Sequence, residues 1–182
     1  MGKHKVCPIQ RNNFFGAQMF IQSKAAPSFI MIDRICDIQS DTIKGVKTFS
    51  QAHAYLGIEA CAQLGAFHAR FDIGFCRHVF LINVKGYHFC PTDKLHGAFI
   101  ITGICLSRSS DAFLYAIQIK NDTSTYNKGN FLFGVADYDE RFDRSRLKRH
   151  YQNIFYDVCD SEPKCPKSKG RVSQSERLSC NA

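Results

Sequence analysis

The stretch that decides the fold reads Tyr55-Leu56-Gly57-Ile58-Glu59-Ala60-Cys61-Ala62-Gln63. It continues through residues 64–69 with apolar residues on all sides, a pattern typical of a helix buried in a core. Glu59 stands out because it places a carboxylate among small apolar neighbours. A buried acid is costly unless it has a partner or a chemical role. Glu59 is therefore the first candidate for a functional residue.

The segments around this helix predict an antiparallel sheet. Two β-prone runs precede the helix and four follow it, separated by turn-rich pieces. The predicted strands span residues 29–35, 42–49, 79–87, 99–106, 112–120 and 131–138. One sheet and one buried helix predict an α+β domain in which the sheet wraps around the helix.

The length of 182 residues suits one principal domain with extensions. An apolar patch within residues 14–21 of the N-terminal extension is compatible with a short helix on the core. Beyond Asp160, Ser, Lys, Pro and Gly predominate, which is typical of disorder. The expected organisation is an N-terminal extension at 1–26, an α+β domain at 27–139, a basic and helix-compatible segment at 140–159, and a disordered basic tail at 160–182.

The net charge of +8 suggests an acidic partner, which would be nucleic acid, an anionic membrane surface or an acidic carrier protein. From Arg141 onward, ten Lys or Arg stand against five Asp or Glu, so +5 of the +8 lies in the last quarter. The alternative is a solvated end whose charge only aids solubility. The sequence shows no secretory signal and no run of about 18 apolar residues, so we expect a soluble, cytoplasmic protein.

Nine cysteines are scattered singly along the chain, which favours free thiols in a reducing compartment. The alternative is a metal cluster formed by Cys159, Cys165 and Cys180. They lack the paired spacing and nearby histidines that are typical of such sites. We therefore expect no metal and no cofactor.

Three motifs in the same order resemble the β-hydroxyacyl-acyl-carrier-protein dehydratase family. Pro27 with Phe29-Ile30-Met31-Ile32-Asp33-Arg34-Ile35 is similar to its opening strand P-x-L-L-x-D-R-V. Residues 58–63 resemble its central-helix motif x-E-x-x-A-Q, and residues 55–59 are closer still to the variant W-V-G-I-E-Y-M-A-Q. Residues 81–85 with Pro91-Thr92-Asp93 are similar to its G-I-x-x-x-x-F-x-x-x-V-x-P-G-D element. The resemblance covers about residues 27–139.

This resemblance implies a hot-dog fold, in which a curved antiparallel sheet wraps a long central helix. It also implies a double hot-dog dimer whose two sheets form one surface. Family members hold a helix carboxylate and a histidine from the neighbouring subunit across an apolar tunnel that accepts an acyl-pantetheine arm. The matched carboxylate is Glu59, and Gln63, one turn later on the same face, would support it by hydrogen bonding or contact a loop of the partner. Backbone N–H groups of Leu56, Gly57 and Ile58 are expected to polarise the thioester carbonyl.

The histidine is where this chain departs from the family, because it lacks the loop G-H-F-P-G-x-P-x-x-P-G. His53, at the start of the helix, is the nearest histidine and the candidate second catalytic residue. The alternative is an exposed residue with no role. His68 is nine residues after Glu59, on roughly the opposite face, and is expected to be a core or interface histidine. His78, His88 and His96 receive no assignment.

Three functions remain open. The first is a 3-hydroxyacyl-thioester dehydratase of fatty-acid or related acyl-chain metabolism, with Glu59 and His53 as the acid and base. The second is a hot-dog thioesterase that needs only the helix carboxylate. The third is a non-catalytic protein that binds acyl chains or a carrier. The expected partners are an acyl-pantetheine thioester, an acidic acyl carrier protein and a second copy of the chain, with homodimers or higher assemblies; nucleic acid is not expected.

Overall fold

The computed structural model describes residues 29–89, 93–121 and 125–159. The described strands form one antiparallel sheet in the order β1-β2-β4-β5-β6-β3. Its elements are β1 (Arg34–Ile38), β2 (Thr42–His53), α1 (Leu56–Asp72), β3 (His78–Phe89), β4 (Lys94–Arg108), β5 (Ala112–Lys120), β6 (Thr125–Ala136) and α2 (Arg144–Asp157). Neither described helix is long and apolar enough to cross a membrane.

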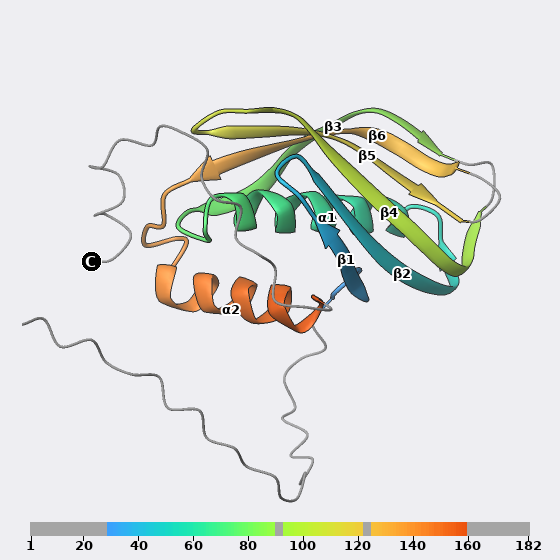
Figure 1. The fold of residues 1–182 in the computed structure, drawn as a ribbon, viewed down its shortest axis with the longest axis horizontal. Coiled ribbons are helices and arrows are strands. Elements are labelled where there is room, and N and C mark those ends of the chain that lie inside the picture. Colours follow the sequence, from blue (N-terminus) through green and yellow to red (C-terminus); the bar gives the residue numbers. More distant parts are fainter. Residues whose placement is uncertain (1–28, 90–92, 122–124, 160–182) are drawn as a thin grey trace, which may run out of the picture.

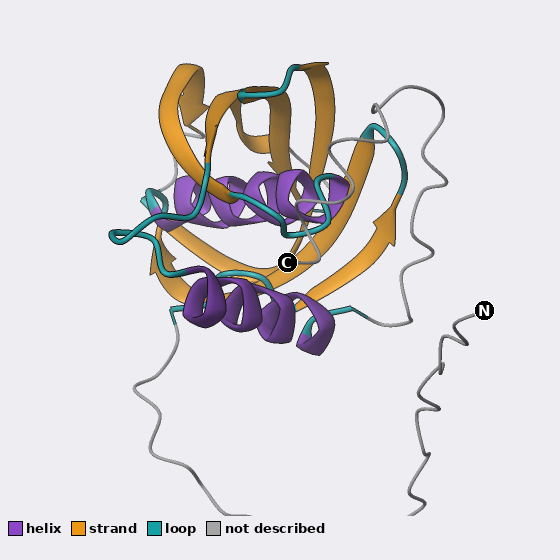
Figure 2. Ribbon diagram, turned by 90° about the vertical axis from the view of Figure 1, so that its left-hand side faces the viewer, coloured by secondary structure: helices purple, strands orange, loops and turns teal. Residues whose placement is uncertain are grey.

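The sheet curves around α1, as Figures 1 and 2 show. The helix approaches the sheet closely at Gly65, which has no side chain. A Cβ atom on Gly65 would lie 2.7 Å from Cε2 of Phe133 and 2.8 Å from Cδ1 of Ile117. Such contacts are too short for a real side chain, so this crossing requires glycine. The α+β class and the wrapped helix predicted from the sequence are confirmed.

The second helix, α2, lies below α1 in Figure 1, with the sheet above. It begins at Arg144 because the Asp143 side chain accepts a hydrogen bond from the backbone N–H of Arg146 at 2.7 Å, which caps its first turn. Phe155 anchors it, fully buried, with its ring 5.2 Å from that of Phe71 and 6.1 Å from that of Phe67. The helix-compatible segment predicted from the sequence thus contains a helix packed on the core.

The first predicted strand is wrong in its N-terminal half, because β1 begins at Arg34 rather than at residue 29. The backbone N–H of Met31 donates to Oε1 of Gln63 at 2.7 Å, so a side chain on α1 takes the place of a neighbouring strand. β4 and β6 begin earlier than predicted, at Lys94 and Thr125. The expected N-terminal helix within 14–21 and the tail at 160–182 lie outside the described residues.

Candidate active site

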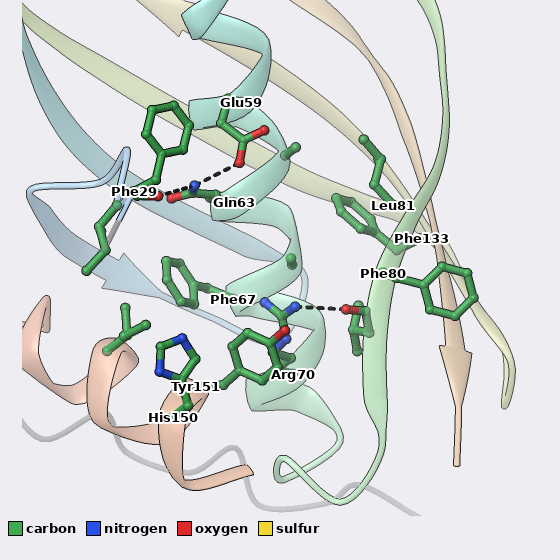
Figure 3. A pocket seen from close by; sticks show the side chains of 15 residues that line it. Phe29, Glu59, Gln63, Phe67, Arg70, Phe80, Leu81, Phe133, His150 and Tyr151 are labelled. Carbon is green, nitrogen blue, oxygen red and sulfur yellow. Dashed lines mark hydrogen bonds between the residues drawn. The ribbon is translucent and has the colours of Figure 1, made fainter. Parts of the chain in front are cut away.

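A pocket of about 530 Å³ lies between α1, α2, β3 and the segment before β1, as Figure 3 shows. Its polar lining groups are Glu59, Gln63, Arg70, His150 and Tyr151. The rest of its wall is apolar and consists of Phe29, Ile30, Ala62, Ala66, Phe67, Val79, Phe80, Leu81, Phe133 and Ile154. A mostly apolar cavity with a few polar groups is the usual form of a small-molecule site.

One face of α1 forms the wall of the pocket between Glu59 at one end and Arg70 at the other. Residues 59, 62, 63, 66, 67 and 70 line the pocket at the three- and four-residue spacing of a helix face. Glu59 and Arg70 are three turns apart on that face, which is roughly 16 Å along the axis at 1.5 Å per residue. The alanines between them leave room for the cavity.

Gln63 holds the Glu59 carboxylate in place. Its Nε2 donates to Oε1 of Glu59 at 2.8 Å and to the carbonyl oxygen of Phe29 at 2.8 Å. Its Oε1 accepts from the N–H of Met31. The hydrogen bond expected from their one-turn spacing is therefore present. Among the described residues, the Glu59 side chain forms no ion pair.

Asp33 fixes the segment that carries Phe29 and Ile30. Its carboxylate accepts from Nζ of Lys47 at 2.6 Å and from the N–H of Thr48 at 2.7 Å. Burial would raise the pKa of this carboxyl group, but Lys47 and the Thr48 N–H outweigh it and lower the pKa. The aspartate of the D-R motif thus positions one wall of the pocket rather than lining it.

The predicted carbonyl-binding residues lie at the start of α1, outside the wall of this pocket. The N–H of Gly57 donates to the carbonyl of Ala54 and that of Ile58 to the carbonyl of Tyr55, each at 3.0 Å. These two donors are already used within the first turn, and Leu56 is not among the lining residues either. The structure therefore brings Glu59 and Gln63 together and leaves Leu56, Gly57 and Ile58 apart from them.

His53 is exposed at the end of β2 and does not line the pocket. Its Nε2 lies 3.2 Å from Nζ of Lys94, and its ring stacks on Tyr55 with centroids 5.4 Å apart. Within one chain it does not complete a pair with Glu59. Its catalytic role stays a prediction that depends on a second subunit.

His68 is a core residue, as expected. Its Nδ1 lies 2.9 Å from the hydroxyl of Tyr115 and its Nε2 lies 2.8 Å from the carbonyl oxygen of Gln39. Burial lowers the pKa of His68, although the hydrogen bond to the Gln39 carbonyl acts in the opposite direction. His78 is buried against Phe142, with centroids 4.3 Å apart. The remaining two of the unassigned histidines, His88 and His96, are exposed on strands.

Sequence reasoning missed the far end of the pocket. Arg70 is only 8% exposed, donates from Nη2 to the carbonyl of Val79 at 2.8 Å and places its guanidinium carbon 3.8 Å from the ring centre of Tyr151. Tyr151 and His150 come from α2. The eleven-residue spacing from Glu59 to Arg70 was the available signal, whereas nothing local indicates where α2 packs.

Within the described parts of the chain, no group of three or more His, Cys, Asp or Glu side chains is arranged to hold a metal ion. Cys61 is buried in the core, and burial raises the pKa of its thiol. Cys159 is half-buried next to β1, while Cys165 and Cys180 lie outside the described residues.

No protein-family model matches the chain, and no curated protein is significantly similar to it. Solved structures do match. The dehydratase heterocomplex ApeI:P from Xenorhabdus doucetiae is similar at 9% identity and a TM-score of 0.54, over 65% of this chain and 89% of that one. The proposed thioesterase yhdA from Lactococcus lactis matches at 10% identity and a TM-score of 0.50, over 57% and 95%. Such low identities establish the architecture alone: the chain has the hot-dog fold.

Proposed function

We propose that this protein acts on acyl thioesters bound in the α1 pocket, with the Glu59 carboxylate as the reacting acid or base. The observation that carries the proposal is the setting of this side chain. It lies on the central helix of a hot-dog fold, in the wall of a mostly apolar pocket, and Gln63 orients it. Apolar walls suit an acyl chain, and a carboxylate without a cationic partner among the described residues suits proton transfer.

Dehydration of a 3-hydroxyacyl thioester is the first candidate reaction. A base removes the proton from the carbon next to the thioester carbonyl, and an acid protonates the departing hydroxyl. The carbon–carbon double bond forms as the carbon–oxygen bond breaks, and water leaves. Glu59 supplies one of these groups, and His53 of the partner subunit supplies the other. The exposure of His53 near the start of α1 supports this assignment, because an exposed side chain is available to a second copy.

Thioester hydrolysis is the second candidate, and the distribution of histidines favours it. Among the described residues that line the pocket, His150 is the one histidine, and Figure 3 shows it on α2 at the opposite end from Glu59. A thioesterase needs only one carboxylate, which activates water or attacks the carbonyl. Binding without chemistry is the third candidate and predicts no turnover of either substrate.

The deciding experiment offers the protein two substrates in separate reactions. Incubation with a 3-hydroxyacyl thioester is followed by enoyl absorbance, and incubation with a saturated acyl-CoA is followed by release of free thiol. We expect enoyl product, and we expect its loss in Glu59→Gln but not in Glu140→Gln, which changes an exposed acid. Thiol release alone selects the hydrolase. If Glu59→Gln retains the wild-type rate on both substrates, the assignment of the site is wrong.

An acidic acyl carrier protein is the expected donor of the substrate. Arg146 and Arg149 are exposed on α2, the helix that supplies Tyr151 to the pocket, so a positive surface lies beside it. Such a surface speeds the docking of an acidic partner and is screened by salt. The double variant Arg146→Glu/Arg149→Glu should raise KM for carrier-bound substrate while leaving kcat unchanged. An equal effect on the pantetheine substrate without carrier would contradict docking at this surface.

A further inference from the structure

The pocket has a second polar end, formed by Arg70. The guanidinium lies between α1 and β3 and rests on the ring of Tyr151, as Figure 3 shows. A guanidinium carries five N–H donors. Nη2 donates to the carbonyl of Val79, whereas Nε is buried and has no hydrogen-bond partner among the described residues.

Arg70 is a buried cation that has no anion beside it among the described residues. None of the ion pairs among the described residues includes it. The Tyr151 ring offsets part of the cost of burying the charge, since its face attracts cations. The Val79 carbonyl and the Tyr151 side chain, through its ring and its hydroxyl, are neutral partners that occupy only part of the donor capacity of the guanidinium. A buried charge of this kind is usually matched by a counter-charge, and here the open space next to it is the pocket.

Between the Glu59–Gln63 pair and Arg70, most of the described wall of the pocket is apolar. Ala62 and Ala66 form it on α1, Val79 and Leu81 on β3, and Ile154 on α2. A ligand that reaches from one end to the other therefore needs a reactive group at Glu59, an apolar middle and an anion at Arg70.

We propose that the Arg70 end binds the terminal carboxylate of the acyl group, so that the preferred substrates are thioesters of dicarboxylic acids. This inference rests on the proposed function, because it places the thioester of the same ligand at Glu59. A carboxylate fits the guanidinium through two parallel hydrogen bonds. It also fits by charge: among the described residues that line the pocket, Arg70 is the one Lys or Arg, which matches a single negative charge better than the double charge of a phosphate.

Binding measurements with thioether analogues of acyl-CoA, which cannot be hydrolysed, test this without catalysis. Calorimetry compares an S-(ω-carboxyalkyl)-CoA with its methyl ester and with an S-alkyl-CoA of equal length. The wild-type protein should bind the carboxylate roughly ten- to a hundredfold more tightly, as expected for a charge-assisted hydrogen-bond pair. Free CoA and inorganic phosphate serve as the competing sources of an anion.

Three variants locate the effect. Arg70→Gln should abolish the preference for the carboxylate, and Arg70→Lys should retain part of it, because it keeps the charge but loses the paired donors. Lys44→Gln, which changes an exposed lysine on β2 away from the pocket, should bind like the wild type. If Arg70→Gln fails to fold by circular dichroism, the wild-type comparison and Arg70→Lys still decide.

The outcomes separate the two proposals. Equal wild-type affinity for the carboxylate and its methyl ester overturns this inference and leaves the acyl-thioester proposal standing. An unchanged carboxylate preference in Arg70→Gln also overturns it. A loss of affinity for free CoA in Arg70→Gln that equals the loss for the carboxylate assigns Arg70 to phosphate and overturns it as well. If no thioether binds, the proposed function itself fails.

Discussion

Oε1 of Glu59 lies 2.8 Å from Nε2 of Gln63, one turn further along α1, and the same amide also bonds to Phe29 and Met31. One side chain thus orients the carboxylate and attaches the segment that forms the adjacent wall of the pocket. Because the three hydrogen bonds share one amide, the geometry of the acid and the shape of the cavity are coupled.

Replacing Gln63 should therefore impair catalysis beyond its effect on folding. In Gln63→Ala the carboxylate loses its orienting donor, and kcat should fall roughly ten- to a hundredfold. Gln63→Glu should shift the acid limb of the pH–rate profile to higher pH, since two adjacent carboxylates resist ionising together. Gln39→Ala, which changes an exposed glutamine, is the control. If the pH–rate profile of Gln63→Glu is the same as that of the wild type, Gln63 has a structural role only.

The partner-subunit role of His53 is testable by mixing two inactive variants. Glu59→Gln and His53→Ala should each be inactive as homodimers. When they are unfolded and refolded together, a heterodimer contains one site with both residues intact, so dehydratase activity should reappear. Separately refolded proteins mixed afterwards are the control. Full activity of His53→Ala alone would remove His53 from the site and leave the assignment of Glu59 unaffected.

Helical periodicity made Glu59 and Gln63 predictable, because residues four apart share a face regardless of the rest of the fold. The same spacing, continued to residue 70, puts Arg70 on that face, but nothing in the sequence shows that this arginine has no carboxylate partner among the described residues. Tyr151 and His150 are about eighty residues further on. Their arrival at the pocket depends on how α2 packs through Phe155, which is a tertiary contact.

Two local features explain why the strands were only partly predictable from the sequence. The β-prone run at 29–33 is not a strand, because Gln63 provides the partner for the Met31 N–H. In β2 the register shifts between Phe49 and Ala52, where Gln51 adopts a positive φ of 55°. A bulge redirects the side chains that follow it. The period-two pattern therefore could not give the direction of His53.

The predicted double hot-dog dimer should form through β3, which is an edge of the sheet. Ile82 is 55% exposed on this strand, and an apolar edge favours pairing with a second copy. Ile82→Lys should convert dimers to monomers in sedimentation velocity. Ile104→Lys changes an isoleucine that is 44% exposed on the interior strand β4 and should leave the dimer intact. A wild type that sediments as a monomer would contradict both the dimer and the role of His53.

Close packing of α1 on the sheet should make Gly65→Ala destabilising. Its Cβ would meet Phe133 and Ile117 at less than 3 Å, and overpacking of this kind costs about 1–3 kcal/mol. Gly103→Ala is the milder substitution for comparison, because its Cβ atom would lie 3.2 Å from its nearest neighbour, Cγ2 of Ile43. Urea unfolding should show the larger loss of unfolding free energy for Gly65→Ala. Equal losses would mean that the helix can shift away from the sheet.

The free energy of unfolding should depend on pH in part because of His68. Burial lowers its pKa below the ordinary value of 6.5, although the carbonyl of Gln39 and the charges of Asp72 and Asp41 oppose this and Arg108 reinforces it. The unfolded chain then binds the proton more readily than the folded chain. The free energy of unfolding is therefore intact above pH 6.5 and decreases as the pH falls from there through the lower folded pKa. The pKa of His78 is lowered as well, by burial and by Arg70, so it contributes in the same direction.

Urea unfolding at several pH values tests this. In His68→Gln the free energy of unfolding should decrease less steeply below pH 6.5 than in the wild type, whatever the stability of the variant at neutral pH. His96→Gln, which changes an exposed histidine, is the control and should keep the wild-type slope. A His68→Gln slope as steep as that of the wild type would mean that the imidazole titrates alike in the folded and unfolded chains, and that its contacts with Tyr115 and Gln39 tolerate the added proton.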